Sequence, residues 1–240
     1  MIVKLSLLIP MYNEEKIISS TLAEVSAYMK ETFIDDYEIL YINDGSKDGC
    51  ASIVAAWEDP HVRLVSYEEN RGKGYAIRRG VMEAAGDVIF FTDCDLAYGC
   101  GVIKQFYDIL SAEGAPDVAV GSRSKHPEGY KGYTLIRKVV SRAYLFVLRL
   151  FGGLKLSDSQ CGCKGFRSPM GKRIFSHCEV DRFAFDFEAI LIGQRAGAVF
   201  CEVPVKVERH GESKVNVVKD TIRMLKDLRR MKKRIKKLDV

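Results

Sequence analysis

Two aspartates one residue apart, Asp93 and Asp95, are the strongest candidates in this sequence for a chemical role. They follow an apolar run at 88–91, which is typical of a buried strand. At the end of a strand, two such carboxylates can converge on one hard cation, Mg²⁺ or Mn²⁺, whose other ligands are water and phosphate oxygens. On its own, however, an Asp-x-Asp pattern is better explained as the solvated start of a loop, because it is common by chance. The surrounding sequence must therefore decide between a cation site and the start of a loop.

Other polar segments follow other predicted strands. Apolar runs predict strands at 4–10, 37–42, 61–66 and 87–91, separated by helices at 14–30, 48–57 and 71–85. This alternation predicts βαβ units and a parallel sheet. In such sheets ligands bind beyond the carboxyl ends of the strands, where the segments 10–14, 43–48 and 93–95 all lie. We therefore expect three polar clusters to meet in one crevice.

The second half of the chain is less regular. It predicts strands at 117–121 and 161–167, one or two further strands within 198–207, and helices at 135–151 and 184–196. Pro204 favours an edge strand or a bulge, because proline cannot donate to a sheet ladder. We find no linker and no internal repeat. The sequence thus predicts one domain over 1–240, made of a first half (1–115), a second half (116–214) and a C-terminal helix (215–240).

Composition restricts the class of protein. Of 240 residues, 47% are hydrophobic and 29% charged, as in soluble globular proteins. We find neither a signal peptide nor a run near the roughly 20 apolar residues of a membrane-spanning helix. Seven cysteines without a Cys-x-x-Cys pair argue against a disulfide framework or a zinc site. These features predict reduced thiols and a cytoplasmic protein.

Positive charge is concentrated at the C-terminus. Residues 219–240 contain ten Lys and Arg against three Asp, a balance of +7 in a chain whose net charge is +5. Apolar residues recur there at helical spacing, at Ile222, Leu225, Leu228, Met231, Ile235 and Leu238. We expect the first half of this helix to cap the protein core and its second half, 229–237, to contact lipid head groups. Nucleic-acid binding is the less favoured alternative, because no aromatic residues are interleaved with the basic ones.

Phosphate-binding glycine motifs are largely missing. The sequence has no Gly-x-x-x-x-Gly-Lys-Ser/Thr, and Gly72-x-Gly74 lacks a third glycine at the dinucleotide spacing. A divalent cation site without such motifs favours a reaction in which a metal-bound diphosphate is the leaving group. A nucleotide sugar in a glycosyl transfer has this chemistry.

Several motifs now carry a family resemblance. Four segments resemble successive motifs of the family-2 inverting glycosyltransferases: IPMYNEE (9–15), NDGSKDG (43–49), NRGKG (70–74) and DCD (93–95). Three more resemble the polyprenyl-phosphate branch of that family, which includes dolichyl-phosphate glucose and mannose synthases: SQCGCKGF (159–166), FDFE (185–188) and GESK (211–214). The resemblance runs from about Leu5 to Lys232. It implies a GT-A fold, an α/β Rossmann-like architecture with a mostly parallel sheet and helices on both faces.

The resemblance also implies roles for individual residues. Pro10, Tyr12, Glu14, Asp44 and Lys73 would bind the nucleotide, and Asp93 and Asp95 would bind the metal and diphosphate. Arg123, Arg137 and Ser141 would bind the acceptor phosphate, and Lys214 would lie on a segment that closes over the diphosphate. The first half would then bind the nucleotide sugar and the second half the acceptor. Arginine forks suit phosphate oxygens, and cations near a leaving diphosphate stabilise its developing charge.

The acceptor decides whether a base is needed. A phosphate monoester has a second pKa of roughly 6, so a lipid phosphate is already largely anionic at neutral pH and can attack without a general base. A sugar hydroxyl would need one, and Asp186 and Glu188 are the candidates. Orienting a lysine or arginine at the acceptor site is an equally good explanation for these two carboxylates.

The residues after Asp95 bear on the donor. Leu96-Ala97-Tyr98-Gly99 is closer to the Leu-Ala-Thr-Pro of the glucosyl branch than to the Leu-Gln-His-Pro of the mannosyl branch. Ala97 cannot supply the metal ligand that a glutamine can. This favours UDP-glucose as donor, with GDP-mannose second, and a polyprenyl phosphate as acceptor; a soluble or glycan hydroxyl is the alternative. We expect peripheral association with the cytoplasmic face of an anionic membrane, through 135–151 and the basic C-terminal helix.

Overall fold

The computed structural model describes residues 4–33, 36–132, 145, 148–149, 153, 155–182, 184–209, 230–231 and 233–238. In the first half, strands and helices alternate: β1 (Leu5–Met11), α1 (Glu15–Phe33), β2 (Tyr37–Asp44), α2 (Cys50–Ala55), β3 (Val62–Tyr67), α3 (Lys73–Glu83), β4 (Val88–Phe91) and α4 (Gly101–Ser111). The second half contains β5 (Val118–Ser122), the 3₁₀ helix η1 (Arg123–Lys125), β6 (Lys164–Arg167), α6 (Ser168–Ser176), α7 (Phe185–Arg195) and β7 (Phe200–Pro204).

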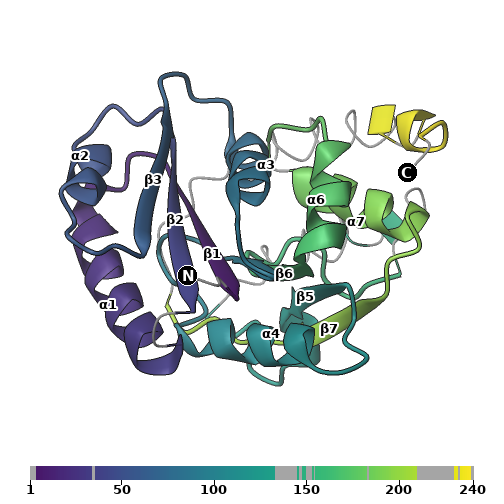
Figure 1. Cartoon of the computed structure of the whole chain (residues 1–240). Helices are drawn as coiled ribbons and strands as arrows, with labels where there is room; N and C mark the ends of the chain where they lie inside the picture. The colour runs from purple at the N-terminus through teal and green to yellow at the C-terminus, as the bar shows by residue number, and fades with distance from the viewer. Residues whose placement is uncertain are drawn as a thin grey trace.

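One seven-stranded sheet runs through both halves, in the order β3-β2-β1-β4-β6-β5-β7. The four strands of the first half are parallel to one another, and β5 is parallel to β7. β6 is antiparallel to both β4 and β5 and joins the two halves. Figure 1 shows β1 to β3 on one side of the molecule and β5 to β7 on the other.

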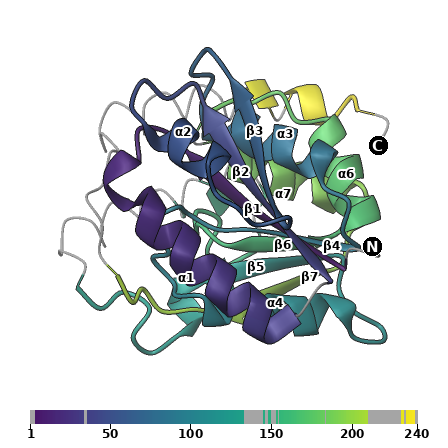
Figure 2. The ribbon, with the colours of Figure 1, turned by 60° about the vertical axis from the view of Figure 1, so that its left-hand side comes forward.

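Helices cover both faces of this sheet (Figure 2). One core lies under α1, α2 and α4, and the other lies under α3, α6 and α7. Side chains of β1 alternate between them, so that Leu7 joins the first core and Leu8 the second, both fully buried. A strand covered on both faces is apolar at successive positions, and burial of each leucine contributes about 1.5–3 kcal/mol.

The predicted order of the first half is confirmed, with element ends displaced by at most three residues. β7 is a single edge strand that ends at Pro204, as the proline predicted. Three features were not predicted: α4, α6 and the antiparallel direction of β6. Most of the helix expected at 135–151 lies outside the described residues.

The C-terminal helix requires a correction. Within 230–238, Met231 and Ile235 are 2% and 6% exposed and belong to the core under α3, α6 and α7. The segment predicted to contact lipid therefore buries an apolar face, while Arg230, Lys233 and Lys236 on its other face stay exposed. Helical spacing allows both, because residues three or four apart share a face. In the part of the chain that the structure describes, none of the helices is long and apolar enough to cross a membrane.

Candidate active site

The loops after β1 and β2 are hydrogen-bonded to each other at the carboxyl ends of these strands. The backbone N–H of Asn13 donates to Ser46 Oγ (3.0 Å), and the backbone N–H of Lys47 donates to Asn13 Oδ1 (2.8 Å). Asn13 has a φ of 52°, a left-handed conformation that asparagine adopts more readily than most residues. Of the predicted nucleotide-binding residues, Tyr12 and Glu14 lie in the first loop, and Pro10 lies just before it, inside β1. These two loops therefore lie side by side at the carboxyl ends of β1 and β2.

Asp44 is the last residue of β2 and is 4% exposed. Its carboxylate accepts hydrogen bonds from Asn70 Nδ2 (2.9 Å) and from the backbone N–H groups of Arg71 (2.8 Å) and Gly72 (2.9 Å). Asp44 therefore fixes the loop that leads into α3. Its contact with a nucleobase stays a prediction.

Lys73, the first residue of α3, forms an ion pair with Asp93, which follows β4. Their side chains are 22% and 35% exposed, so the pair is accessible to solvent. Burial opposes the charge of Lys73, but Asp93, with Asp186 and Asp95 nearby, raises the pKa of this ammonium above its usual value. Two residues predicted from separate motifs are thus in contact.

Asp95 lies in the same loop, and its Oδ1 accepts a hydrogen bond from the backbone N–H of Ala97 (3.1 Å). Burial and the negative charge of Asp93 both raise the pKa of Asp95, so a cation between the two carboxylates would relieve their repulsion. Among the described residues, no group of three or more His, Cys, Asp or Glu is placed to hold a metal ion. Two carboxylates fit Mg²⁺ or Mn²⁺ in the mode that leaves other positions to water and phosphate. Asp93 and Asp95 would hold it.

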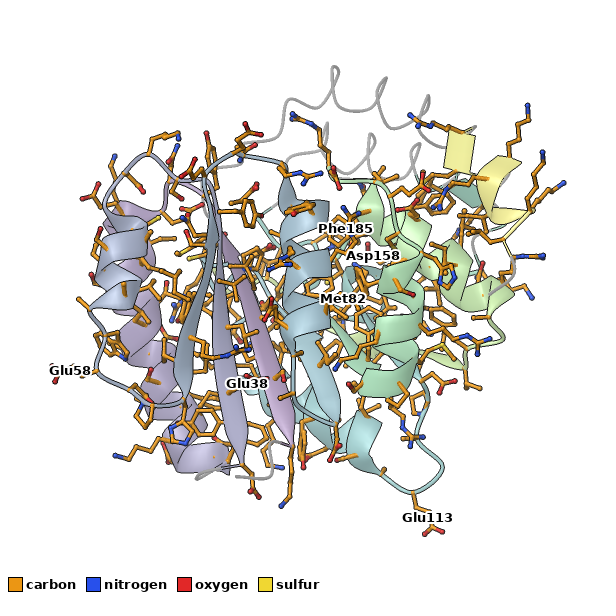
Figure 3. All side chains as sticks on the ribbon, turned by 45° about the horizontal axis from the view of Figure 1, so that its top comes forward. Glu38, Glu58, Met82, Glu113, Asp158 and Phe185 are labelled. Carbon is orange, nitrogen blue, oxygen red and sulfur yellow. The ribbon has the colours of Figure 1, made fainter. Side chains whose placement is uncertain are left out.

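Arg123 follows β5 and forms a two-pronged ion pair with Asp158. The distances are 2.7 Å from Nε to Oδ2 and 3.0 Å from Nη2 to Oδ1. Asp158 is 1% exposed and lies toward the middle of the molecule (Figure 3). Burial opposes the charge of Arg123, but Asp158 raises the pKa of the guanidinium well above its usual value. Asp158 thereby orients the arginine predicted to bind the acceptor phosphate.

A second buried ion pair joins β6 to α7. Lys164, 1% exposed, donates from Nζ to Asp186 Oδ1 (2.7 Å) and to the carbonyl oxygen of Cys161 (2.7 Å). Burial raises the pKa of Asp186, although Lys164 and then Lys73 act in the opposite direction. Lys73 and Asp93 both act on the charge of Asp186, so this carboxylate lies within electrostatic reach of the Lys73–Asp93 pair.

Glu188, two residues further along α7, has different surroundings. It is fully buried, accepts hydrogen bonds from the backbone N–H groups of Glu179 (2.9 Å) and Val180 (2.8 Å), and forms an ion pair with Arg234 of the C-terminal helix. Glu188 therefore attaches the C-terminal helix to the 179–180 segment. Of the two candidate bases, Asp186 is the one within electrostatic reach of Lys73 and Asp93.

The two groups of site residues meet at Tyr98. Burial raises the pKa of its phenol, and both Arg123 and Asp93 are near enough to act on it. The described part of the site thus contains the Lys73–Asp93–Asp95 group and, across Tyr98, Arg123. Three other predicted site residues lie outside the described residues: Arg137, Ser141 and Lys214.

Sequence reasoning gave no role to four residues of this region: Tyr98, Asp158, Gly162 and Lys164. Lys164 carried the clearest signal, since a lysine inside the predicted strand 161–167 would need a buried partner. Asp158 offered none, because its partner lies 35 residues away in sequence.

Comparison with known proteins identifies the class. Residues 6–175 match the family described as Glycosyl transferase family 2. This match covers more than half of the chain, so the chain belongs to that family and is a glycosyltransferase.

Within the family, the chain is similar to dolichyl-phosphate β-glucosyltransferases. The Trichomonas vaginalis protein is 32% identical over 223 residues, which cover 87% of this chain and 65% of that protein. The Drosophila melanogaster protein is 29% identical over 243 residues, which cover 94% of this chain and 73% of that protein. The chain thus spans about two thirds to three quarters of the length of these relatives.

A solved structure confirms the predicted GT-A fold. It is glucosyl-3-phosphoglycerate synthase from Mycobacterium tuberculosis in complex with Mn²⁺, uridine diphosphate and glucosyl-3-phosphoglycerate. The TM-score is 0.67 at 20% identity, over 94% of this chain and 80% of that chain. At this identity the likeness shows the fold alone.

Proposed function

We propose that this glycosyltransferase moves glucose from UDP-glucose to a polyprenyl phosphate of the dolichyl type, with Mg²⁺ or Mn²⁺ as cofactor. The observation that carries the proposal is the group formed by Lys73, Asp93 and Asp95 at the carboxyl ends of the parallel strands. Such a group suits a nucleoside diphosphate, because the lysine can contact phosphate oxygens directly and the two carboxylates can bind them through a cation.

Similarity supports the choice of sugar and acceptor. The named relatives are dolichyl-phosphate β-glucosyltransferases, and the structural neighbour was solved with uridine diphosphate and Mn²⁺. Arg123, held by Asp158 near Tyr98, supports an anionic acceptor. A guanidinium orients a phosphate better than a hydroxyl, because its N–H groups match two phosphate oxygens at once.

The surroundings of Asp186 support an acceptor that needs no base. Its Oδ1 accepts a hydrogen bond from Lys164, so the carboxylate already has a buried cation as partner. A phosphate monoester, with its second pKa of roughly 6, is deprotonated without help and can attack the anomeric carbon while UDP leaves. Arg123 would hold the attacking phosphate and Lys73 the leaving diphosphate. These two cations would offset the repulsion between the two anionic groups. A bound divalent cation would neutralise further charge on the diphosphate.

Transfer of labelled sugar tests the proposal. UDP-[¹⁴C]glucose is incubated with the protein, Mn²⁺ and dolichyl phosphate in detergent micelles, and the organic phase is counted. We expect label in the lipid fraction, no label when dolichol replaces its phosphate, and much less label from GDP-[¹⁴C]mannose. Label from GDP-mannose alone would show that the donor is GDP-mannose and not UDP-glucose. Label only on 3-phosphoglycerate or a glycan hydroxyl would reject the lipid acceptor.

We also propose peripheral binding to the cytoplasmic face of an anionic membrane. Three exposed lysines near the C-terminus support it: Lys233 in a helical turn, and Lys236 and Lys237 in the turn that follows. Each lysine near an anionic surface contributes about 1 kcal/mol, so changing all three to glutamate should weaken binding by roughly 100-fold or more. Sedimentation with phosphatidylserine-containing vesicles measures this, with pure phosphatidylcholine vesicles as control. Equal sedimentation of both proteins would reject this surface.

A further inference from the structure

A short turn, 161–163, lies directly against the carboxylate of Asp93. A Cβ added to Gly162 would overlap the Oδ2 of Asp93, so that only a glycine leaves room for this side chain. On its Oδ1 side, Asp93 is paired with Lys73. The backbone of Gly162 and the ammonium of Lys73 therefore confine the carboxylate from two directions.

Three hydrogen bonds fix the turn. The carbonyl of Cys161 accepts from Lys164 Nζ (2.7 Å), and the carbonyl of Cys163 accepts from the backbone N–H of Gly121 (3.0 Å). The backbone N–H of Gly162 donates to the hydroxyl oxygen of Tyr98 (3.1 Å). Of these three contacts, the one from Tyr98 reaches the residue that touches Asp93.

Tyr98 belongs to the loop that carries both aspartates. The backbone N–H of Leu96 donates to the carbonyl of Asp93 (3.1 Å), and Leu96 adopts a φ of 49°, which is uncommon for leucine. Beyond this tight reversal, the side chain of Tyr98 is 6% exposed, and its hydroxyl reaches the N–H of Gly162. A buried phenol is costly without a hydrogen-bond partner, and the N–H of Gly162 supplies one.

We propose that Tyr98 is a positioning residue for the divalent cation. Its hydroxyl holds Gly162 against Asp93 and thereby fixes the distance and direction of the Asp93 carboxylate relative to Asp95. The inference rests on the proposed function, because it assumes that these two carboxylates bind the cation. Groups that orient metal ligands without touching the metal typically change metal affinity by roughly 10- to 100-fold when they are removed.

The test removes one oxygen atom. Tyr98→Phe keeps the ring and deletes the hydroxyl, and Mn²⁺ binding is measured by electron paramagnetic resonance in the presence of UDP. We expect a dissociation constant for Mn²⁺ roughly 10-fold higher than in the wild type. At saturating Mn²⁺ the kcat should return to within about twofold of the wild type, since positioning acts through occupancy. Tyr41→Phe is the matched control, because the hydroxyl of Tyr41 is buried and has no hydrogen-bond partner among the described residues.

A second variant guards against a misfolded Tyr98→Phe. Gly162→Ala presses a methyl group on the Asp93 carboxylate directly and should weaken Mn²⁺ binding at least as much, with thermal melting used to confirm that each variant is folded. Wild-type affinity in folded Tyr98→Phe would overturn the inference, as would an equal loss in Tyr41→Phe. Failure of the wild type itself to bind Mn²⁺ with UDP would instead overturn the proposed function.

Discussion

The two halves of the sheet hold their charged residues in different ways. In the first half, Lys73 and Asp93 lie partly exposed, and Asp44 is satisfied by a loop side chain and backbone N–H groups. Among the described residues of the second half, three ion pairs of Lys or Arg have both side chains 21% exposed or less: Arg123–Asp158, Lys164–Asp186 and Arg234–Glu188.

This difference separates residues whose mutation should affect ligand binding from residues whose mutation should affect stability. The partly exposed charges of Lys73 and Asp93 are available to a ligand, so changing them should affect turnover more than folding. A buried pair, by contrast, is strongly destabilising when one partner is removed, because the other stays behind without compensation. The second half therefore holds its site residues rigidly at the expense of tolerance to mutation.

Glu188→Ala should give the largest loss of stability. It leaves Arg234 without its buried partner and removes the acceptor of two backbone N–H groups, so we expect the free energy of unfolding to fall by about 3–5 kcal/mol. Glu179→Ala is the matched control, because Glu179 pairs with the same arginine but is 61% exposed. We expect less than about 1 kcal/mol there. Urea denaturation measures both, and similar losses would contradict the contrast between buried and exposed pairs.

Lys164→Met should cost about 3 kcal/mol at neutral pH and less in acid. Burial already raises the pKa of Asp186, and removing Lys164 raises it further. A carboxyl group whose pKa is raised on folding stabilises the native state at low pH and loses that contribution as the pH rises through the folded pKa. The difference between wild type and variant should therefore grow from pH 4 to pH 7. A difference that shrinks over this range would show that Asp186 is not the group left unpaired.

Asp44→Asn addresses the first half. The amide replaces one accepting oxygen by a donor that faces the N–H groups of the 70–72 loop, so we expect a loss of about 1–2 kcal/mol in stability. UDP binding should weaken by about tenfold, because this loop leads to Lys73. Calorimetry with UDP separates the two effects. Unchanged UDP affinity in the folded variant would show that the 70–72 loop has no role in donor binding.

Glu24 should give the smallest effect. It pairs with Arg209 on the surface, and this arginine lowers the pKa of Glu24. The contribution is present above the pKa of roughly 4.3 that the carboxyl has in the unfolded chain, and it is lost as the pH falls through the lower folded value. A double-mutant cycle with Glu24→Gln and Arg209→Gln should give less than about 1 kcal/mol at pH 7 and still less in high salt. A coupling of several kcal/mol would mean that this surface pair behaves like a buried one.

The first half could be predicted because its signals are local. Each apolar strand is followed at once by its polar residues, and parallel strands bring those ends together, so that Lys73 and Asp93 meet although they come from different motifs. The helix α4 was missed although its pattern is clear. Val102, Ile103, Phe106 and Leu110 recur at helical spacing and are all buried.

The second half depends on pairings over long distances in sequence. Arg123 and Asp158 are 35 residues apart, and Glu188 and Arg234 are 46 residues apart. No spacing rule connects such residues, so the sequence could not show that Glu188 pairs with Arg234 whereas Asp186 pairs with Lys164. The burial of Met231 was missed because surrounding basic residues drew the interpretation toward lipid.

Titration calorimetry of UDP, with Mn²⁺ and with EDTA, measures whether Asp93 and Asp95 bind a cation for the donor. We expect the wild type to bind UDP at least about 100-fold more tightly with Mn²⁺, and a double variant, Asp93→Asn with Asp95→Asn, to have the EDTA affinity under both conditions. Asp108→Asn, at an exposed surface pair, should behave as the wild type. Metal-independent UDP binding, or a double variant that keeps the response to Mn²⁺, would contradict the claim that these two aspartates bind a cation for the donor diphosphate.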